Sequence, residues 1–238
     1  MGTSTDRSGG SGGAWTPLKH AATSFMHAAE AGRGNGTPAR RVLARHVAVL
    51  GGAGGAVATA RAGRAGAQRL GAVLAGVAAN GLGATLTERG LGDLVGGDRL
   101  SVLDGLCSLV AGDGADVDGQ AARDAVLDVL DEMFPAADSW DDLDAVRVDA
   151  DGVRHLLELF LARYVYNRIP VIAERLARLS DPAAAQRAEA DLQRLVESLV
   201  HLQLPDDPLR VDWAGPQGRR IADESLRAAY DALAVLED

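Results

Sequence analysis

The sequence contains one cysteine, Cys107, and only three each of Trp, Tyr and Phe in 238 residues. A single cysteine excludes an internal disulfide and any metal cage built from several thiolates. With so few rings, the hydrophobic core has to be built from Ala, Leu and Val, which favours packing of helix on helix over a β-sandwich. The composition therefore predicts an all-α protein kept in a reducing cytoplasm.

The spacings that most catalytic and metal sites require are also absent. The five histidines occur singly, without the H-x-x-x-H spacing of a zinc site. In VAVLGGAGGAVA, Val57 stands where a dinucleotide-binding fingerprint needs its last glycine. Two loops that resemble calcium loops begin at Gly114 and Arg147, which are not carboxylates. Cys107 is expected to be a buried hydrophobe rather than a nucleophile, so we expect no catalytic residue, no metal and no cofactor.

Charge is divided unevenly along the chain. Residues 1–90 carry ten Lys or Arg against three acidic residues, net +7, and residues 91–238 carry fourteen against thirty, net −16. A basic segment can meet nucleic acid, anionic lipid or an acidic protein surface. The arginines lie among Ala and Gly without aromatic neighbours to stack on bases, which disfavours nucleic acid. A nucleic-acid-binding module is kept as an alternative, and its candidate residues are Arg40, Arg41, Arg45, Arg61, Arg64 and Arg69.

The first 13 residues, MGTSTDRSGGSGG, hold no aliphatic side chain after the initiator methionine. Ordering them would cost about 1 to 2 kcal/mol per residue and bury almost nothing. We therefore expect a disordered Gly/Ser-rich tail, and it lacks the apolar run of a secretory signal. Gly2 is small enough for the methionine to be removed, which would leave a glycine amine at the end of this tail.

Apolar residues recur at helical spacing through the rest of the chain. Asp98 is expected to cap a helix with Leu100 and Cys107 on its buried stripe, and Asp118 is expected to cap the following helix. The GGAGG segment is expected to end a helix, and Pro170 to kink or split one. The expected helices span residues 17–31, 37–50, 61–87, 99–112, 120–134, 153–179 and 181–200, with a last one from 216.

An acidic stretch without a clear period, AADSWDDLDAVRVDADG, predicts a boundary in the chain. The expected parts are a tail at 1–13, a small-residue-rich helical region at 14–134, an acidic linker at 135–150 and a helical bundle at 151–238. Residues 70–87 carry no charge, but their glycines and Asn80 leave little apolar surface for a membrane span. A membrane-acting effector that exposes this segment is kept as a second alternative.

Three segments together resemble the QatB family, a component of bacterial Qat anti-phage defence systems. They are the opening MGTST with its Gly/Ser run, the middle RAGRAGAQRLGAVLAG with LGDLVGGDRLSVLDGL, and LLELFLARYVYNRIPVIAERL with DPAAAQRAEADLQRLVESLV. The resemblance implies a system that includes an ATPase, a QueC-like ATP-dependent enzyme and a TatD-like nuclease. It also implies that the QueC-like member joins a carboxylated 7-deazaguanine to a partner's N-terminal glycine.

On this resemblance we expect a non-enzymatic, cytoplasmic defence subunit. Gly2 is the expected modification acceptor, and it forms with Thr3, Ser4 and Thr5 the tail that the partner enzyme recognises. The helical body is expected to dock on the QueC-like enzyme (QatC-type), and the Qat ATPase (QatA-type) is the second candidate partner. Nucleic acid and membrane are disfavoured as partners. A free α-amine, with a pKa of about 8, is partly unprotonated and nucleophilic at neutral pH.

Overall fold

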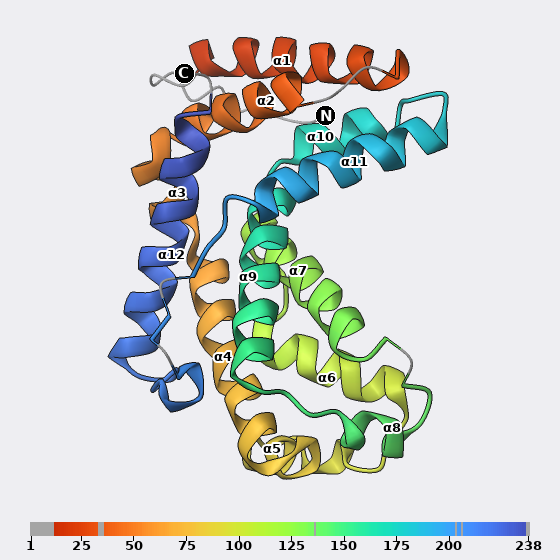
Figure 1. Cartoon of the computed structure of the whole chain (residues 1–238), viewed down its shortest axis with the longest axis vertical. Coiled ribbons are helices and arrows are strands. Elements are labelled where there is room, and N and C mark those ends of the chain that lie inside the picture. Colours follow the sequence, from red (N-terminus) through yellow and green to blue (C-terminus); the bar gives the residue numbers. More distant parts are fainter. Residues whose placement is uncertain (1–11, 33–35, 136, 203, 206, 237–238) are drawn as a thin grey trace, which may run out of the picture. The chain divides into compact units, whose positions relative to one another are not determined.

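The computed structural model describes residues 12–32, 36–135, 137–202, 204–205 and 207–236. All regular elements within these residues are helical, which confirms the predicted all-α fold (Figure 1). Contacts divide the chain into two units. Unit 1 covers residues 1–58, 169–195 and 230–238, and unit 2 covers residues 59–168 and 196–229.

Unit 1 is built around its first helix, which packs against α2 and α10. Its helices are α1 (Gly12–Glu30), α2 (Gly36–Val49), α10 (Pro170–Leu176) and most of α3 (Gly52–Thr59) and α11 (Pro182–Glu197). Leu18 and Phe25 of α1 and Val42 of α2 are fully buried. Between α1 and α10, the Arg175 guanidinium donates from Nη1 to Thr23 Oγ1 at 2.9 Å. Apolar packing and this hydrogen bond therefore contribute to the contacts between these helices.

Unit 2 is centred on α9, which lies alongside α7 and α4 (Figure 1). Its first elements are α4 (Arg61–Asn80), α5 (Leu82–Glu88), the 3-10 turn η1 (Gly92–Leu94), α6 (Arg99–Ala111) and α7 (Val117–Met133). Its later elements are α8 (Trp140–Ala145), α9 (Ala150–Asn167), the 3-10 turn η2 (Pro208–Arg210) and most of α12 (Pro216–Ala234). Helix α6 packs on both α4 and α7, so α4, α6, α7 and α9 share one core.

Glycines on α4 let aromatic rings approach its backbone. A Cβ atom added at Gly63 would lie 2.2 Å from Cε1 of Tyr164, and one at Gly71 would lie 2.3 Å from Cδ2 of Trp213. Tyr164 also stacks on Phe160, with ring centroids 6.2 Å apart. Tyr164 and Trp213 are thus packed where α4 has no side chain, and its small residues allow close packing against these rings.

We expect Gly63→Ala to lower the free energy of unfolding by about 1 to 3 kcal/mol, because the new methyl group overlaps the Tyr164 ring. In Gly83→Ala the nearest atom to the new Cβ lies at 3.4 Å, an ordinary contact, so this control should be neutral or stabilising. Urea denaturation followed by circular dichroism measures both. Equal stability of the two variants would contradict the packing described here.

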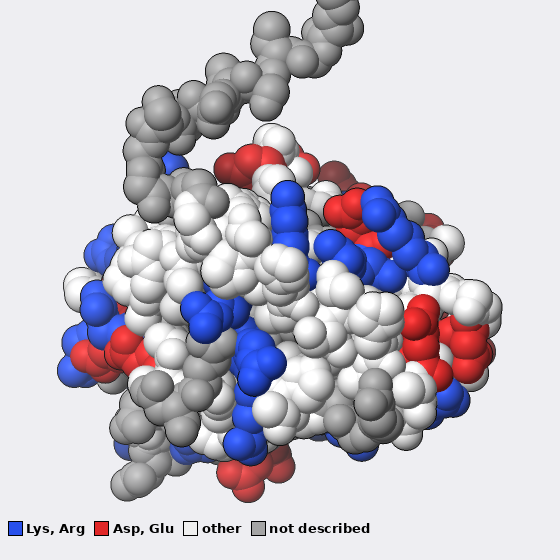
Figure 2. All heavy atoms as spheres, turned by 90° about the horizontal axis from the view of Figure 1, so that it is seen from above, with Lys and Arg blue, Asp and Glu red and all other residues white. Residues whose placement is uncertain are grey.

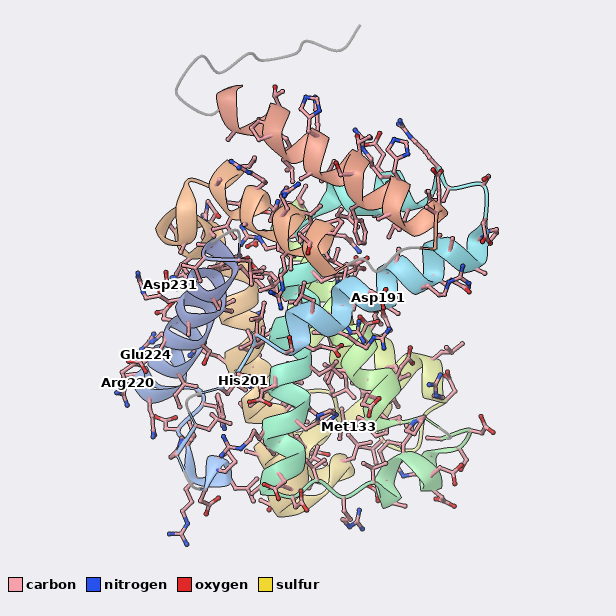
Figure 3. The ribbon with its side chains drawn as sticks, turned by 45° about the horizontal axis from the view of Figure 1, so that its top comes forward. Met133, Asp191, His201, Arg220, Glu224 and Asp231 are labelled. Atoms are coloured by element: carbon pink, nitrogen blue, oxygen red, sulfur yellow. The ribbon has the colours of Figure 1, made fainter. Side chains whose placement is uncertain are left out.

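Helix α12 separates an exposed charged face from a buried apolar one. Arg220, Glu224 and Asp231 are exposed along it (Figure 3), and Arg220 lies 3.9 Å from Glu224. Leu226 and Tyr230 on the opposite face are fully buried. The helix predicted from residue 216 is therefore confirmed, and its buried residues follow the 3.6-residue period.

Several helix boundaries differ from the sequence predictions. Helix α1 begins at Gly12, inside the stretch expected to be tail, and continues through Pro17. The segment expected to form one helix over 61–87 is broken at Gly81, which has a φ of 83°. In GGAGG a turn does end α2, as predicted, but most of the segment then forms α3. A Cβ atom added at Gly55 would lie 2.1 Å from Leu50 O, so only glycine lets the α3 backbone come this close to that carbonyl.

Two predicted boundaries are confirmed. Asp98 caps α6 by accepting a hydrogen bond from Ser101 N at 3.0 Å. The long helix expected over 153–179 is split, with α9 ending at Asn167 and α10 beginning at Pro170. Leu100, in contrast, was expected to be buried and is 74% exposed; the buried stripe of α6 is Val102, Leu103, Leu106, Cys107 and Val110.

The acidic stretch at 135–150 contains a helix that the sequence analysis missed, α8. It is held by a capping box in which Ser139 Oγ accepts from Asp142 N, and Asp142 Oδ2 accepts from Ser139 N at 3.0 Å. Hydrogen bonding to the Ser139 hydroxyl lowers the pKa of the Asp142 carboxyl. Residues on both sides of this stretch belong to unit 2, and the linker at 135–150 stays a prediction.

Candidate functional site

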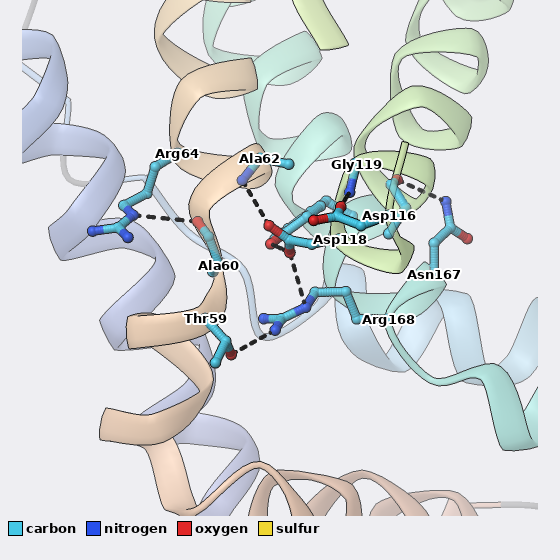
Figure 4. Close-up of polar contacts among 11 residues, drawn as sticks. Thr59, Ala60, Ala62, Arg64, Asp116, Asp118, Gly119, Asn167 and Arg168 are labelled. Carbon is cyan, nitrogen blue, oxygen red and sulfur yellow. Dashed lines mark hydrogen bonds and ion pairs between the residues drawn. The ribbon is translucent and has the colours of Figure 1, made fainter. Parts of the chain in front are cut away.

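A largely buried polar cluster of unit 2 surrounds Asp118 on the first turn of α7 (Figure 4). Its Oδ2 accepts from Ala62 N at 2.7 Å, and its Oδ1 accepts from the Tyr164 hydroxyl at 2.5 Å. Arg168 at the end of α9 places Nε 3.4 Å from Oδ1 and donates from Nη2 to Thr59 Oγ1 at 2.8 Å. One carboxylate thus connects the start of α4 with α7 and α9.

Asp118 does not cap its own helix, contrary to the sequence prediction. Asp116 caps α7 instead, by accepting from Gly119 N at 2.7 Å. Asp118 binds a backbone N–H in the first turn of α4, whose own cap residue, Ala60, offers no side-chain hydrogen bond. A carboxylate from α7 therefore satisfies a donor that α4 leaves open at its N-terminus.

The cluster around Asp118 links helices and does not assemble a nucleophile with its base. The Arg168 and Asp118 side chains are only 7% and 18% exposed. The Arg168 guanidinium lies 5.6 Å from the centroid of the Tyr164 ring, a cation–π distance. A carboxylate, a phenol and a guanidinium held by one another in this way stabilise the junction of three helices.

Cys107 is fully buried, as the sequence predicted. Burial raises the pKa of its thiol, and Sγ lies 3.8 Å from Arg123 O. A raised pKa reduces the thiolate fraction at neutral pH, and the thiolate is the reactive form. Both the burial and the pKa direction argue for a packing role.

We expect cells that carry the Qat system with the Cys107→Ser variant to stay protected against phage, provided that the variant folds. Burying a hydroxyl in place of a thiol should lower the free energy of unfolding by about 1 to 3 kcal/mol. Plaque assays and urea denaturation of the same variant check the two statements. A well-folded variant without protection would show that the thiol has a chemical role.

Acidic and histidine side chains form no metal cluster in the described ranges: no group of three or more His, Cys, Asp or Glu is placed to hold an ion. A cavity of about 320 Å³ does bring His155 and His201 near three glutamates and Arg163. Several of its polar groups already have partners: Arg163 Nη2 lies 3.0 Å from Glu197, His155 Nε2 lies 3.6 Å from Glu132, and Glu158 Oε1 accepts from Leu202 N at 3.0 Å. These contacts join neighbouring elements of unit 2.

The six arginines of the nucleic-acid alternative lie on two helices of different units. Arg40, Arg41 and Arg45 are on α2 in unit 1, whereas Arg61, Arg64 and Arg69 are on α4 in unit 2. Arg64 places Nη1 3.1 Å from Asp223, so its charge is paired. Figure 2 shows Lys and Arg side chains in short rows between uncharged and acidic ones. None of these contacts favours a nucleic-acid interface.

The uncharged segment of the membrane alternative is divided between α4 and α5 and is largely buried. Leu70, Leu74 and Val77 of α4 and Leu82 and Leu86 of α5 are each at most 1% exposed. Among the described helices, none is by itself long and apolar enough to cross a membrane. Helices α2 and α3 reach that length and hydropathy only as a pair, which is bent by 71°.

The predicted acceptor Gly2 and the recognition residues Thr3, Ser4 and Thr5 lie outside the described residues, so their roles stay predictions. The first described helix, α1, presents Trp15, which is 42% exposed. Sequence analysis missed the Asp118 cluster, because its partners are 46 or more residues apart and the aspartate pattern pointed to a helix cap.

These observations define the class of protein: in the residues that the structure describes, it is an all-helical protein whose polar clusters join helices. A family model described as "QatB: Qat anti-phage system associated protein QatB" matches residues 51–233, most of the chain. The chain belongs to the QatB family and is a component of the Qat anti-phage system. No curated protein and no solved structure matches it.

Proposed function

We propose that this chain is a non-enzymatic subunit of its Qat system whose Gly2 accepts a 7-deazaguanine-type group from a QueC-like ATP-dependent enzyme. Family membership supports a role beside other Qat proteins. The single observation that carries the finer proposal is the N-terminal sequence, in which Gly2 is followed by Thr3, Ser4 and Thr5 and by a Gly/Ser run. Glycine has no side chain to hinder attack by its amine, and Gly/Ser-rich sequences are typical of flexible linkers.

The chemistry requires a nucleophilic amine and an activated carboxyl group. ATP activates the carboxyl of the 7-deazaguanine in the partner's site, and the amine nitrogen of Gly2 attacks the carboxyl carbon. An amide bond forms, the amine loses a proton, and the activating group leaves. With a pKa of about 8, the α-amine is unprotonated in a fraction of molecules at neutral pH, whereas a lysine amine with a pKa of about 10.4 is nearly fully protonated.

In this proposal the helical body docks the chain on its partners. The family match covers residues 51–233, which hold the helices from α3 onward and leave out the tail, α1 and α2. When the body is bound to the partner, the short tail keeps the Gly2 amine near the partner's active site. This tethering raises the effective concentration of the amine there. The QueC-like enzyme (QatC-type) is the proposed docking partner, and the Qat ATPase (QatA-type) is the second candidate. We propose that the complex forms in the cytoplasm.

A reconstituted reaction tests the proposal. The purified chain is incubated with the QueC-like enzyme of its own system, ATP and carboxylated 7-deazaguanine, and tandem mass spectrometry locates any adduct. We expect one ATP-dependent adduct on the Gly2 amine. An unmodified chain in the presence of enzyme that activates the carboxylate, or an adduct on a lysine, would contradict the proposal.

A further inference from the structure

Unit 2 contains a second cavity, of about 310 Å³, on the surface of α4. Ala65, Gln68, Arg69, Ala72 and Val73 line it from one face of that helix, at the i, i+3, i+4 spacing. Arg89 from the end of α5, Leu109 of α6 and Ala214 complete the wall. The lining is mostly small and apolar, and its charged members are two arginines.

Both arginines are held in place by backbone carbonyls. Arg69 donates from Nη1 to Val110 O at 3.4 Å, and Arg89 donates from Nη2 to Ala72 O at 3.1 Å. The third polar side chain, Gln68, donates from Nε2 to Trp213 O at 3.2 Å. A guanidinium has five N–H donors, so each arginine retains donors for a ligand while its position is restricted.

Neither arginine is paired with a carboxylate in the described part of the chain. Other arginines of unit 2 are paired: Arg64, Arg99 and Arg123 lie within 3.4 Å of the carboxylates of Asp223, Asp131 and Asp104. The carboxylate nearest in sequence to Arg89 belongs to Glu88, which accepts from Asn80 Nδ2 at 3.3 Å. The cavity therefore presents two unneutralised positive charges in an otherwise acidic protein.

We propose that this cavity, the Arg69–Arg89 pocket, binds a small organic anion with a carboxylate or phosphate group and an apolar body. The guanidinium groups bind the anion through charge-assisted, forked hydrogen bonds. The apolar body lies against Ala72, Val73 and Leu109. The volume is at the lower end of the range for ligand pockets, which suits one ring or a short chain rather than a polymer.

Phenyl phosphate titrated into the ¹⁵N-labelled full chain tests the pocket. We expect saturable shifts of amides around the Arg69–Arg89 pocket, with a Kd on the order of 1 mM. Benzyl alcohol, which lacks the charge, and inorganic phosphate, which lacks the ring, should each bind at least about tenfold more weakly. Inorganic phosphate binding as tightly as phenyl phosphate would overturn the proposed organic ligand.

Variants locate the binding to these side chains. Arg69→Gln and Arg89→Gln should each weaken phenyl phosphate binding about tenfold, whereas Arg219→Gln, an exposed arginine outside the pocket, should leave it unchanged. Ala65→Leu keeps both guanidinium groups but narrows the cavity, so it should weaken phenyl phosphate as well. The proposal would be overturned if folded Arg69→Gln bound phenyl phosphate as tightly as the native chain, or if Arg219→Gln weakened this binding equally.

An acidic peptide, acetyl-Glu-Glu-Glu-amide, tests for an acidic protein partner. Tighter binding of this peptide than of phenyl phosphate would also overturn the proposal, in favour of such a partner.

Discussion

A tag retained in front of Gly2 abolishes protection against phage and leaves the free energy of unfolding unchanged; this is the first result we expect. In the proposed reaction the Gly2 amine is the nucleophile, and an extension in front of Gly2 would replace this amine with an amide nitrogen that cannot attack the activated carboxyl. Gly2→Pro should act in the same way, because a ring nitrogen cannot present the same amine. In plaque assays, the protection of cells that carry the whole system with either variant should fall to the level of cells that lack the system.

Matched controls separate the amine from the rest of the chain. The same tag at the C-terminus should keep protection, and Asp6→Ala should have a smaller effect than Gly2→Pro. Thermal melting of each protein shows whether it is folded. Full protection by the N-terminally tagged chain would mean that the helical body carries the function by binding alone.

The second large effect is expected at Asp118. Asp118→Ala should lower the free energy of unfolding by about 3 to 5 kcal/mol, because buried Arg168 loses the carboxylate of its ion pair. The change also removes the acceptor of Ala62 N–H at the start of α4 and of the Tyr164 hydroxyl. Guanidinium denaturation followed by circular dichroism measures the loss.

Asp124 on the same helix provides the control. It is exposed and accepts a hydrogen bond from Gln120 at 2.7 Å, so Asp124→Ala should change the free energy of unfolding by no more than about 0.5 kcal/mol. Replacing both Asp118 and Arg168 with apolar residues should recover much of the stability, since no buried charge is then left unpaired. A small effect of Asp118→Ala, equal to that of Asp124→Ala, would show that this cluster does not hold the helices together.

Local signals in the sequence predicted the helical fold well. Pro170 lacks the N–H that a continuous helix needs and accepts the first position of α10, so its effect follows from covalent structure. Asp98 caps α6 through a contact three residues away, which spacing alone reveals. The alternation of charged and apolar residues on α12 likewise depends on near neighbours.

Features that depend on distant residues could not be predicted. Leu100 has the spacing of a buried residue, but it lies in the first turn of α6, where the described part of the chain leaves it 74% exposed. Several glycines occur in 61–87, and periodicity does not distinguish Gly81, whose φ is 83°, as the one that interrupts the helix. The Asp118 cluster and the Arg69–Arg89 pocket each combine elements far apart in the chain, and periodicity carries no information about such pairs.

The intact mass of this chain, purified from cells that carry its complete Qat system, tests the central claim most directly. We predict one added mass that fits an amide of carboxylated 7-deazaguanine, located at Gly2 by fragmentation and absent when the QueC-like gene is deleted. A chain that protects its host and yet shows only the unmodified mass, with or without the QueC-like gene, would contradict the proposal.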